Sequence, residues 1–251
     1  MTIENSDKDH RQILGVRFYV GDVHGAIGQM LKGGLLVVPA APALKDLATN
    51  TEYREALLAA DVAITDSAFM TIVWNLIERD NIRRVSGLEY LRELLLLPDV
   101  TQPGNTFWVM ASPVSAKRNI DWLTQNNIHV PEENVYLAPM YRGQIEDMEL
   151  LDALRRLRPK HIVITVGGGT QEKLGLYIKR NLDYSPAIHC IGAAVAFLSG
   201  DQVRIPGWAD KLYLGWLLRC ISSPKRFVPR YWSARKLFPL MLRYRSTLPV
   251  E

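Results

Sequence analysis

Short apolar segments alternate along the chain with longer amphipathic ones. The apolar segments have the length of buried parallel strands, and they cover Ile13–Val20, Leu35–Val38, Val62–Thr65, Phe107–Ala111, Val135–Ala138, His161–Val166 and Ile188–Ile191. Between them, apolar residues recur at helical spacing over Thr51–Ala60, Ala68–Arg79, Leu88–Leu97, Pro113–Gln125, Asp147–Arg158 and Gln171–Asn181. Such alternation predicts an α/β fold, with a parallel sheet covered by helices on both faces.

The pattern changes past Gly200. Strand-like segments stop, prolines recur, and apolar residues mix with arginine. The segments Tyr213–Ile221 and Tyr231–Arg243 are typical of short amphipathic helices. At 251 residues, the chain suits one α/β domain with an appendage better than two full domains. We therefore predict an α/β domain over residues 1–200 and a helical appendage over residues 201–251.

The predicted appendage carries most of the positive charge. From Arg204 to Glu251 there are ten basic and two acidic residues, which gives +8, whereas the rest of the chain carries twenty basic and twenty-four acidic residues, or −4. This asymmetry indicates an anionic partner, either phospholipid, a diphosphate or nucleic acid. Aromatic residues among the arginines favour a helix at a membrane surface, with Trp216, Trp232 and Phe238 as its contacts. We expect no nucleic-acid partner, because no known nucleic-acid module accompanies the charge.

The cysteines, the histidines and the hydropathy of the chain indicate where the protein works and whether it binds metal. Cys190 and Cys220 lie in apolar surroundings, which is typical of reduced, buried thiols, and the five histidines are scattered, so we expect no metal site. The first ten residues are polar, which argues against a signal peptide. No run reaches the roughly 18–20 apolar residues that span a bilayer. We expect a cytoplasmic protein that is peripheral to the inner face of the cell membrane.

Asp66 is the first candidate for chemistry. It directly follows the predicted strand Val62–Thr65, and ligands of parallel sheets bind beyond the carboxyl ends of the strands. A carboxylate in that place can act as a general base. The alternative is that Asp66 caps the helix that begins near Ala68, since aspartate favours the N-cap position.

A glycine loop follows the predicted strand His161–Val166. Gly167, Gly168 and Gly169 precede Gln171 and Glu172 at the start of the next helix. Glycines at this position let backbone N–H groups approach a diphosphate, and the Gln171 amide can bind sugar hydroxyls or a uracil edge. The loop does not complete a dinucleotide-binding motif, and a simple tight turn is the alternative.

Arginines provide the remaining candidates. Arg83 and Arg84 precede Val85-Ser86-Gly87, and Arg219, Arg226 and Arg230 lie in the appendage. Pairs of arginines and basic tails are most often solvated surface, so this alternative stays open for each of them.

The motifs resemble, in their order and spacing, the WecG/TagA/CpsF family of bacterial glycosyltransferases. The likeness extends from about Gly15 to Tyr231, and its most specific parts are Thr51–Ala60, Ala63–Asp66, Arg84–Gly87, Gly169–Glu172, Arg204–Trp208, Trp216–Arg219 and Pro224–Tyr231. The resemblance implies a Rossmann-like fold and an inverting transfer that needs neither metal nor cofactor. A sugar of the N-acetylmannosamine type, or a related hexose or uronic acid, would pass from a UDP donor to a polyprenyl-diphosphate-linked saccharide in surface polysaccharide biosynthesis.

The same resemblance implies roles for single residues. Asp66 matches the catalytic base, while Arg84, the Gly167–Gly169 loop, Gln171 and Glu172 would bind the donor. Arg219, Arg226 and Arg230 match appendage arginines that close over the pocket and neutralise diphosphate. This agrees with the chemistry, since a base must remove the proton of the acceptor hydroxyl while cations stabilise the departing UDP. Without a metal, guanidinium groups and backbone amides must supply that stabilisation.

Several positions depart from the usual pattern of the family. Val38, Ala40 and Ala196 are apolar where the family usually carries polar residues, and Gly215 replaces a glutamate. These departures motivate a second hypothesis, a non-catalytic subunit that binds a nucleotide sugar or assists assembly of a polysaccharide machine. A nicotinamide-dependent dehydrogenase is a third and weaker hypothesis. Such enzymes bind the ribose of the cofactor with an acid at the end of the strand after the glycine loop, and no suitable acid ends that strand here. The apolar faces of the appendage also allow a homo-oligomer.

Overall fold

The computed structural model describes residues 8–203 and 205–249, and these residues contain one eight-stranded sheet. Its strand order is β1-β2-β4-β3-β8-β7-β5-β6. The strands are β1 (His10–Ile13), β2 (Val16–Tyr19), β3 (Gly34–Val37), β4 (Val62–Ile64), β5 (Thr106–Met110), β6 (Val135–Leu137), β7 (His161–Ile164) and β8 (Ala187–Cys190). All neighbouring pairs are parallel except β1 and β2. The predicted Rossmann-like α/β fold is confirmed.

The prediction of one strand over Ile13–Val20 was wrong. The chain reverses at Leu14 and Gly15, which both have positive φ, and β1 pairs antiparallel with β2. Glycine adopts this conformation without strain, so the turn has a local cause. The end of the chain covers the turn, because the backbone N–H groups of Leu14 and Gly15 donate to the carbonyls of Arg245 and Ser246.

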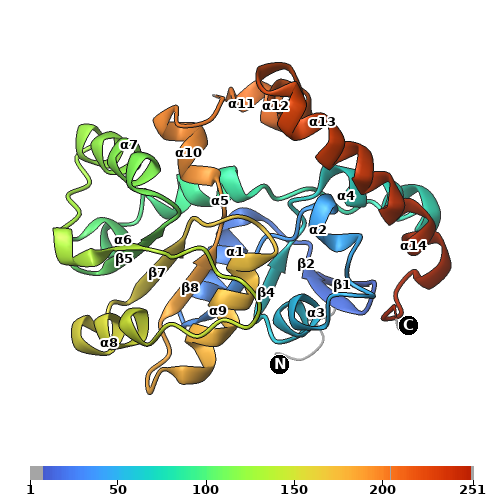
Figure 1. The fold of residues 1–251 in the computed structure, drawn as a ribbon. Helices are drawn as coiled ribbons and strands as arrows, with labels where there is room; N and C mark the ends of the chain where they lie inside the picture. Colours follow the sequence, from blue (N-terminus) through green and yellow to red (C-terminus); the bar gives the residue numbers. More distant parts are fainter. Residues whose placement is uncertain (1–7, 204, 250–251) are drawn as a thin grey trace.

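Helices cover both faces of the sheet (Figure 1). Alternate residues of a strand point to opposite faces, so Leu35 and Val37 of β3 belong to one buried cluster and Leu36 to the other. The first cluster contains residues of α3 (Thr51–Leu58), α4 (Ala68–Glu78), α8 (Met148–Leu157) and α9 (Thr170–Asn181). The second contains residues of α1 (Val23–Met30), α5 (Gly87–Leu94), α7 (Pro113–Gln125) and α10 (Ala194–Ser199). Of these eight helices, α1 and α10 were not predicted.

Short helical segments complete the connections. The helix α2 (Ala41–Leu44) directly follows β3, while α6 (Pro98–Thr101) precedes β5 and the 3-10 turn η1 (Glu132–Asn134) precedes β6. Because α2 begins where β3 ends, it marks the carboxyl edge of the sheet.

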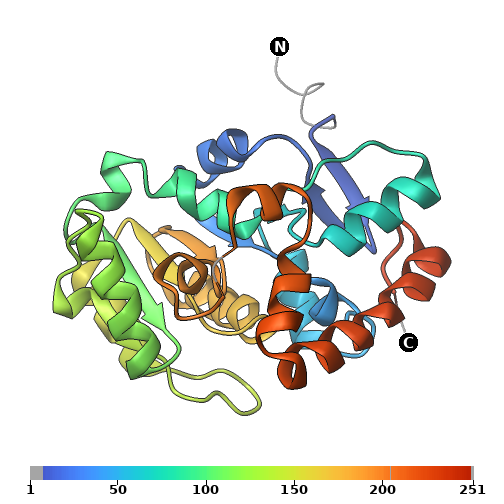
Figure 2. The same ribbon diagram turned by 90° about the horizontal axis from the view of Figure 1, so that it is seen from above.

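The C-terminal helices cross the carboxyl edge of the sheet (Figures 1 and 2). They are α11 (Gly207–Lys211), α12 (Gly215–Ser222), α13 (Pro224–Ser233), the 3-10 turn η2 (Ala234–Lys236) and α14 (Leu237–Tyr244). The helix α13 contacts α2, and α14 contacts α4. Ala234, Leu237 and Met241 join the first core cluster, so the appendage packs onto the body. Its treatment as a separate domain from residue 201 stays a prediction.

The second appendage helix differs from the prediction of Tyr231–Arg243. Tyr231 already belongs to α13, which begins at Pro224, and α14 begins only at Leu237. Proline at the first helical turn is favourable because that turn does not need its missing N–H. Among the described residues, we find no helix with the length and apolar character that crossing a bilayer requires.

Candidate functional site

Asp66 lies just beyond β4, at the carboxyl edge of the sheet. Its Oδ1 accepts the backbone N–H of Gly87 at 2.9 Å, and its side chain is 25% exposed. The capping alternative was wrong, because the N-cap of α4 is Ser67, whose hydroxyl accepts the N–H of Met70 at 3.2 Å. Asp66 is therefore a fixed carboxylate that still reaches solvent.

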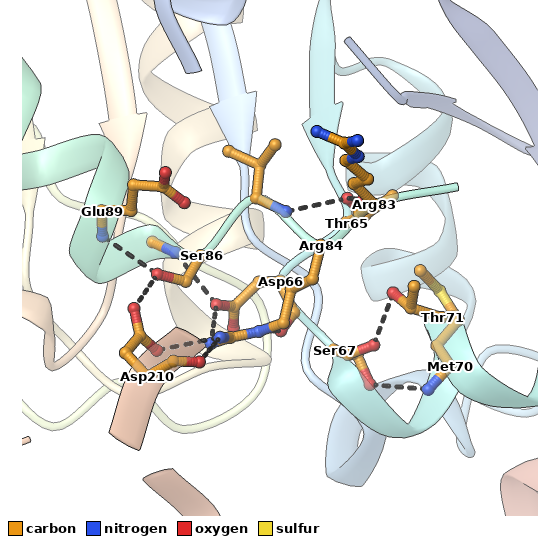
Figure 3. A network of polar contacts seen from close by, with 12 residues as sticks. Thr65, Asp66, Ser67, Met70, Thr71, Arg83, Arg84, Ser86, Glu89 and Asp210 are labelled. Carbon is orange, nitrogen blue, oxygen red and sulfur yellow. Dashed lines mark hydrogen bonds and ion pairs between the residues drawn. The ribbon is translucent and has the colours of Figure 1, made fainter. Parts of the chain in front are cut away.

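Arg84 connects Asp66 to the appendage (Figure 3). Its Nε donates to the backbone carbonyl of Asp66 at 2.6 Å, and its Nη2 lies 3.4 Å from Asp66 Oδ1. Its Nη1 donates to Oδ1 of Asp210 at 2.8 Å and to the Asp210 carbonyl at 3.0 Å. The alternative of a solvated arginine pair holds for the exposed Arg83 and is wrong for Arg84, whose side chain is only 14% exposed.

The charge of Arg84 is stabilised by its carboxylate partners. Burial by itself lowers the pKa of the guanidinium, but the charges of Asp66 and Asp210 and the hydrogen bond to Asp210 raise it, and the net shift is upward. Arg84 is therefore cationic at every physiological pH. The ring of Tyr213 lies beside the guanidinium, with its centroid 5.7 Å from the Arg84 Cζ atom.

The loop between Arg83 and Gly87 is held in place from two sides (Figure 3). Thr65 at the end of β4 donates its hydroxyl to the Arg83 carbonyl at 2.7 Å and accepts the N–H of Val85 at 3.1 Å. The hydroxyl of Ser86 donates to Oδ2 of Asp210 at 2.6 Å and accepts the N–H of Glu89 at 3.0 Å, which caps α5. The backbone N–H that holds Asp66 thus belongs to a well-anchored loop.

The glycine loop forms the turn from β7 into α9. Gly169 has a φ of 93°, a conformation that favours glycine, and Gly167 and Gly168 are exposed. The N–H of Gly169 donates to Oε2 of the buried Glu172 at 2.7 Å. Glu172 therefore supports the loop from inside the protein, and the prediction that it binds the donor stays a prediction.

Gln171 and Glu172 form a buried polar pair beneath this loop. The Gln171 Nε2 donates to Oε1 of Glu172 at 3.0 Å, while Oε1 of Gln171 is buried with no hydrogen-bond partner among the described residues. Burial raises the pKa of Glu172, although hydrogen bonds from Gln171 and Gly169 and the charge of Arg230 oppose this. A β-carbon placed on Gly192, just after β8, would lie 3.4 Å from the Gln171 Oε1 atom.

Arg230 brings the appendage to the glycine loop. A β-carbon placed on Gly168 would lie 3.9 Å from the Arg230 Nη2 atom. Burial lowers the pKa of Arg230, and the neighbouring charges of Arg219 and Arg226 lower it further. The structure therefore places a cation from α13 beside the N-terminus of α9, where anions bind favourably.

The other two appendage arginines lie among aromatic rings. Arg219 donates from Nη1 to the Tyr231 hydroxyl at 2.9 Å, and its Cζ atom lies 4.8 Å from the ring centroid of Phe197 and 4.7 Å from that of Phe227. Arg226 is exposed, with its Cζ atom 5.4 Å from the centroid of Phe227. Neither has a described contact with Asp66, so their roles stay predictions.

The three predicted membrane contacts are all solvent-exposed. Trp232 is 68% exposed, Trp216 is 48% exposed and Phe238 is 42% exposed. Exposed aromatic side chains on helices that also carry arginine are compatible with a place at a membrane interface. Contact with a membrane stays a prediction.

Asp210 and Ser86 are site residues that the sequence interpretation missed. Asp210 is one of only two acids in the basic segment from Arg204 onward, and this contrast was a usable signal. Ser86 and Glu89 have the spacing of a helix start, which the sequence also carries. Neither signal reveals that the two side chains meet.

The fold and the site define the class of protein. A carboxylate paired with an arginine beyond one parallel strand, and a glycine-rich helix start beside another arginine at the same edge of the sheet, are typical of enzymes that act on nucleotide-linked groups. The sequence model of the family described as Glycosyl transferase WecG/TagA/CpsF family matches residues 11–249. The chain belongs to this family and is a glycosyltransferase.

Two curated relatives carry the same name, N-acetylglucosaminyldiphosphoundecaprenol N-acetyl-beta-D-mannosaminyltransferase. The chain is 23% identical to the protein from Bacillus spizizenii (strain ATCC 23059 / NRRL B-14472 / W23) over 210 residues, which cover 80% of this chain and 78% of the relative. It is 22% identical to the protein from Bacillus subtilis (strain 168) over 188 residues, which cover 72% and 71%.

Proposed function

We propose that this glycosyltransferase moves a sugar of the N-acetylmannosamine type, or a related hexose or uronic acid, from a UDP donor to a polyprenyl-diphosphate-linked saccharide. The observation that carries the proposal is the partly exposed carboxylate of Asp66, fixed by Gly87 at the same sheet edge as the glycine loop and Arg230. The printed names of the two relatives support the substrate class.

The reaction is a single displacement with inversion at the anomeric carbon. Asp66 takes the proton of the acceptor hydroxyl while that oxygen forms a bond to the anomeric carbon. The bond from this carbon to the UDP oxygen breaks, and UDP leaves with the electron pair. A single carboxylate suffices because no covalent sugar–enzyme intermediate has to form.

The departing diphosphate gains negative charge that the protein must stabilise. We assign this role to Arg230 and to the exposed backbone at Gly167 and Gly168, which lie at the positive end of the α9 dipole. Arg219 and Arg226 add positive charge from the same appendage. In this proposal guanidinium groups and backbone amides stabilise the leaving group, and no metal ion takes part.

The lipid tail of the acceptor fixes where the enzyme works. A polyprenyl chain stays in the bilayer, so its diphosphate and first sugars lie at the surface. Trp216, Trp232 and Phe238 would enter the interface while the basic residues of the appendage meet anionic headgroups. We propose that the protein acts peripherally at the inner face of the cell membrane.

The test is transfer by the purified protein. It is incubated with a panel of UDP-sugars and a polyprenyl-diphosphate-linked N-acetylglucosamine acceptor, and the lipid product is identified by mass spectrometry and the linkage by NMR. We expect one UDP-sugar to give an elongated lipid with inverted anomeric configuration, and activity that survives EDTA. Asp66→Asn should lower kcat about 10²- to 10⁴-fold.

The same experiment tests the second candidate, a non-catalytic binding subunit. Val38 supports that candidate, because it is buried at the end of β3 and packs against Gly87, with a methyl group 3.5 Å from the position of a Gly87 β-carbon. An apolar side chain there offers no hydrogen bond next to Gly87, the residue whose N–H holds Asp66. UDP-sugars that bind in calorimetry but never react with acceptor or water would favour this candidate and overturn the proposed transfer.

A further inference from the structure

We propose that Asp210 is a positioning residue for the reaction, which holds Arg84 against Asp66 and so couples docking of the appendage to the arrangement of the base. The proposal rests on the proposed function of Asp66. Asp210 is an acid of the appendage, whereas the sequence predicted only basic residues of the appendage to bind the diphosphate.

The donors of the Arg84 guanidinium are divided between two aspartates, Asp66 and Asp210, and reach the carboxylate and the backbone carbonyl of each. Nε and Nη2 face Asp66, while Nη1 donates to both the carboxylate and the backbone carbonyl of Asp210. A guanidinium has five N–H groups in a rigid plane. Two contacts go to each aspartate, so Asp210 holds one end of the plane in which Arg84 meets Asp66.

Asp210 also holds the loop that carries Gly87. Its second oxygen accepts the Ser86 hydroxyl at 2.6 Å, and the next residue, Gly87, donates its N–H to Asp66. Both contacts of the Asp66 carboxylate, from Arg84 and from Gly87, are therefore connected to one acid on α11 (Figure 3).

Burial makes this arrangement sensitive to the loss of Asp210. The Asp210 side chain is only 10% exposed, much like Arg84. Removing one partner of a buried, charged hydrogen bond leaves the other unsatisfied. Without the Asp210 carboxylate, Arg84 would have Asp66 as its remaining carboxylate partner, and its Nη1 would keep only the backbone carbonyl of residue 210.

A purely structural fastening of the appendage is the competing explanation, and the chain offers a matched control. Like Asp210, Asp201 belongs to the predicted appendage, which begins at residue 201. It pairs with an arginine of the body, Arg118 on α7, at 2.9 Å. This pair has no contact with Asp66, Arg84 or Ser86 among the described residues. A fastening role predicts that neither variant lowers the kcat of the folded protein, whereas a positioning role predicts that Asp210→Asn alone lowers it.

The experiment compares Asp210→Asn and Asp201→Asn with the unaltered full chain, using the UDP-sugar and lipid acceptor that support transfer. For Asp210→Asn we expect kcat to fall about 10- to 100-fold, the effect of losing one charged hydrogen bond in the transition state, while KM for the UDP-sugar changes less than about threefold. Asp201→Asn should keep kcat within about twofold of the unaltered chain. Asp210→Glu, which keeps the charge, should recover part of the lost kcat.

Equal effects of Asp210→Asn and Asp201→Asn on kcat, or a change in KM alone, would overturn the proposal. Hydrogen exchange distinguishes a failure of the proposed role of Asp210 from a failure of the proposed function. If the unaltered chain transfers no sugar, the proposed function fails, but exchange at the Gly87 amide should still be about 10-fold faster in Asp210→Asn than in Asp201→Asn. An unchanged Gly87 amide would overturn the role of Asp210 whatever the reaction.

Discussion

The carboxylate of Asp66 accepts the backbone N–H of Gly87, across a gap of 2.9 Å between two loops that the sequence separates by 21 residues. The neighbouring Ser67 performs the capping of α4. Asp66 is therefore not needed to start the helix, and its side chain is held by a donor that an asparagine in its place would still satisfy.

Replacing Asp66 by asparagine should remove activity without unfolding the protein. The amide oxygen can accept the Gly87 N–H, but it cannot take a proton from the acceptor. General-base catalysis contributes about 10²- to 10⁴-fold, so we expect kcat to fall by that factor while the dissociation constant for UDP stays unchanged in calorimetry. Full activity of this variant would remove Asp66 from the mechanism.

Replacing Ser67 by alanine should lower the stability of the protein and leave its activity unchanged. The variant loses the hydroxyl that accepts the Met70 N–H, and loss of such a cap lowers the free energy of unfolding by about 1 kcal/mol. Urea unfolding measures this change, and kcat should stay close to that of the unaltered chain. Together the two neighbours separate helix capping from chemistry, and a stable but inactive Ser67→Ala would contradict the assignment.

Local patterns were enough to predict most of the fold. The helix over Pro113–Gln125 has the predicted bounds, and β7 lies within the predicted strand His161–Val166. Both depend on residues that are close in sequence. The hairpin at Leu14 and Gly15 was missed because apolar residues continue across it, so that the glycine was the only sign of a reversal.

The candidate site could be predicted only in part. Asp66 and the glycine loop lie at one sheet edge because both follow parallel strands, and this rule needs no coordinates. The contact between Arg84 and Asp210 joins residues 126 positions apart. It depends on how the appendage folds back, which no spacing in the sequence reveals.

Arg230 and Trp232 on α13 should separate donor binding from membrane binding. Arg230 lies beside Gly168, so Arg230→Ala should weaken UDP binding about 10-fold, as expected for one charged contact with a phosphate. Trp232 is mostly exposed, so Trp232→Ala should reduce sedimentation with vesicles of anionic phospholipid and leave UDP binding unchanged. If Trp232→Ala leaves vesicle binding as it was, this face of α13 is ordinary surface.

Gly175 allows α9 to pack closely on the sheet. A β-carbon there would lie 2.6 Å from the Cys190 Sγ atom and 2.6 Å from a methyl group of Leu35, so Gly175→Ala must displace these buried side chains or the helix itself. Overpacking of this kind costs about 1–3 kcal/mol, measurable as a lower free energy of unfolding in urea. Gly28→Ala is the matched control, because nothing lies within 4 Å of its added carbon.

A buried chain of hydrogen bonds should make the stability depend on pH. Asp99 can only accept from Nε2 of His161, at 3.4 Å. With neutral rings, His161 Nδ1 must then accept from Nε2 of His189 at 3.3 Å, and Nδ1 of His189 must accept the Tyr90 hydroxyl at 2.9 Å. A second proton on either ring would break this order. Burial lowers the pKa of His161 and, more strongly, that of His189.

The sign of the pH dependence follows from these lowered pKa values. In the unfolded chain both histidines take up a proton near pH 6.5, whereas in the folded protein they resist it. The unfolded state therefore binds more protons below that pH, and the free energy of unfolding should fall as pH drops from 7.5 to 5.5, by up to about 1.4 kcal/mol per pH unit for each histidine. Urea unfolding at several pH values measures this slope, and His189→Gln, which cannot titrate, should show a shallower one whatever its stability at pH 7.5. Equal slopes in the two proteins would mean that His189 is protonated as readily in the fold as outside it.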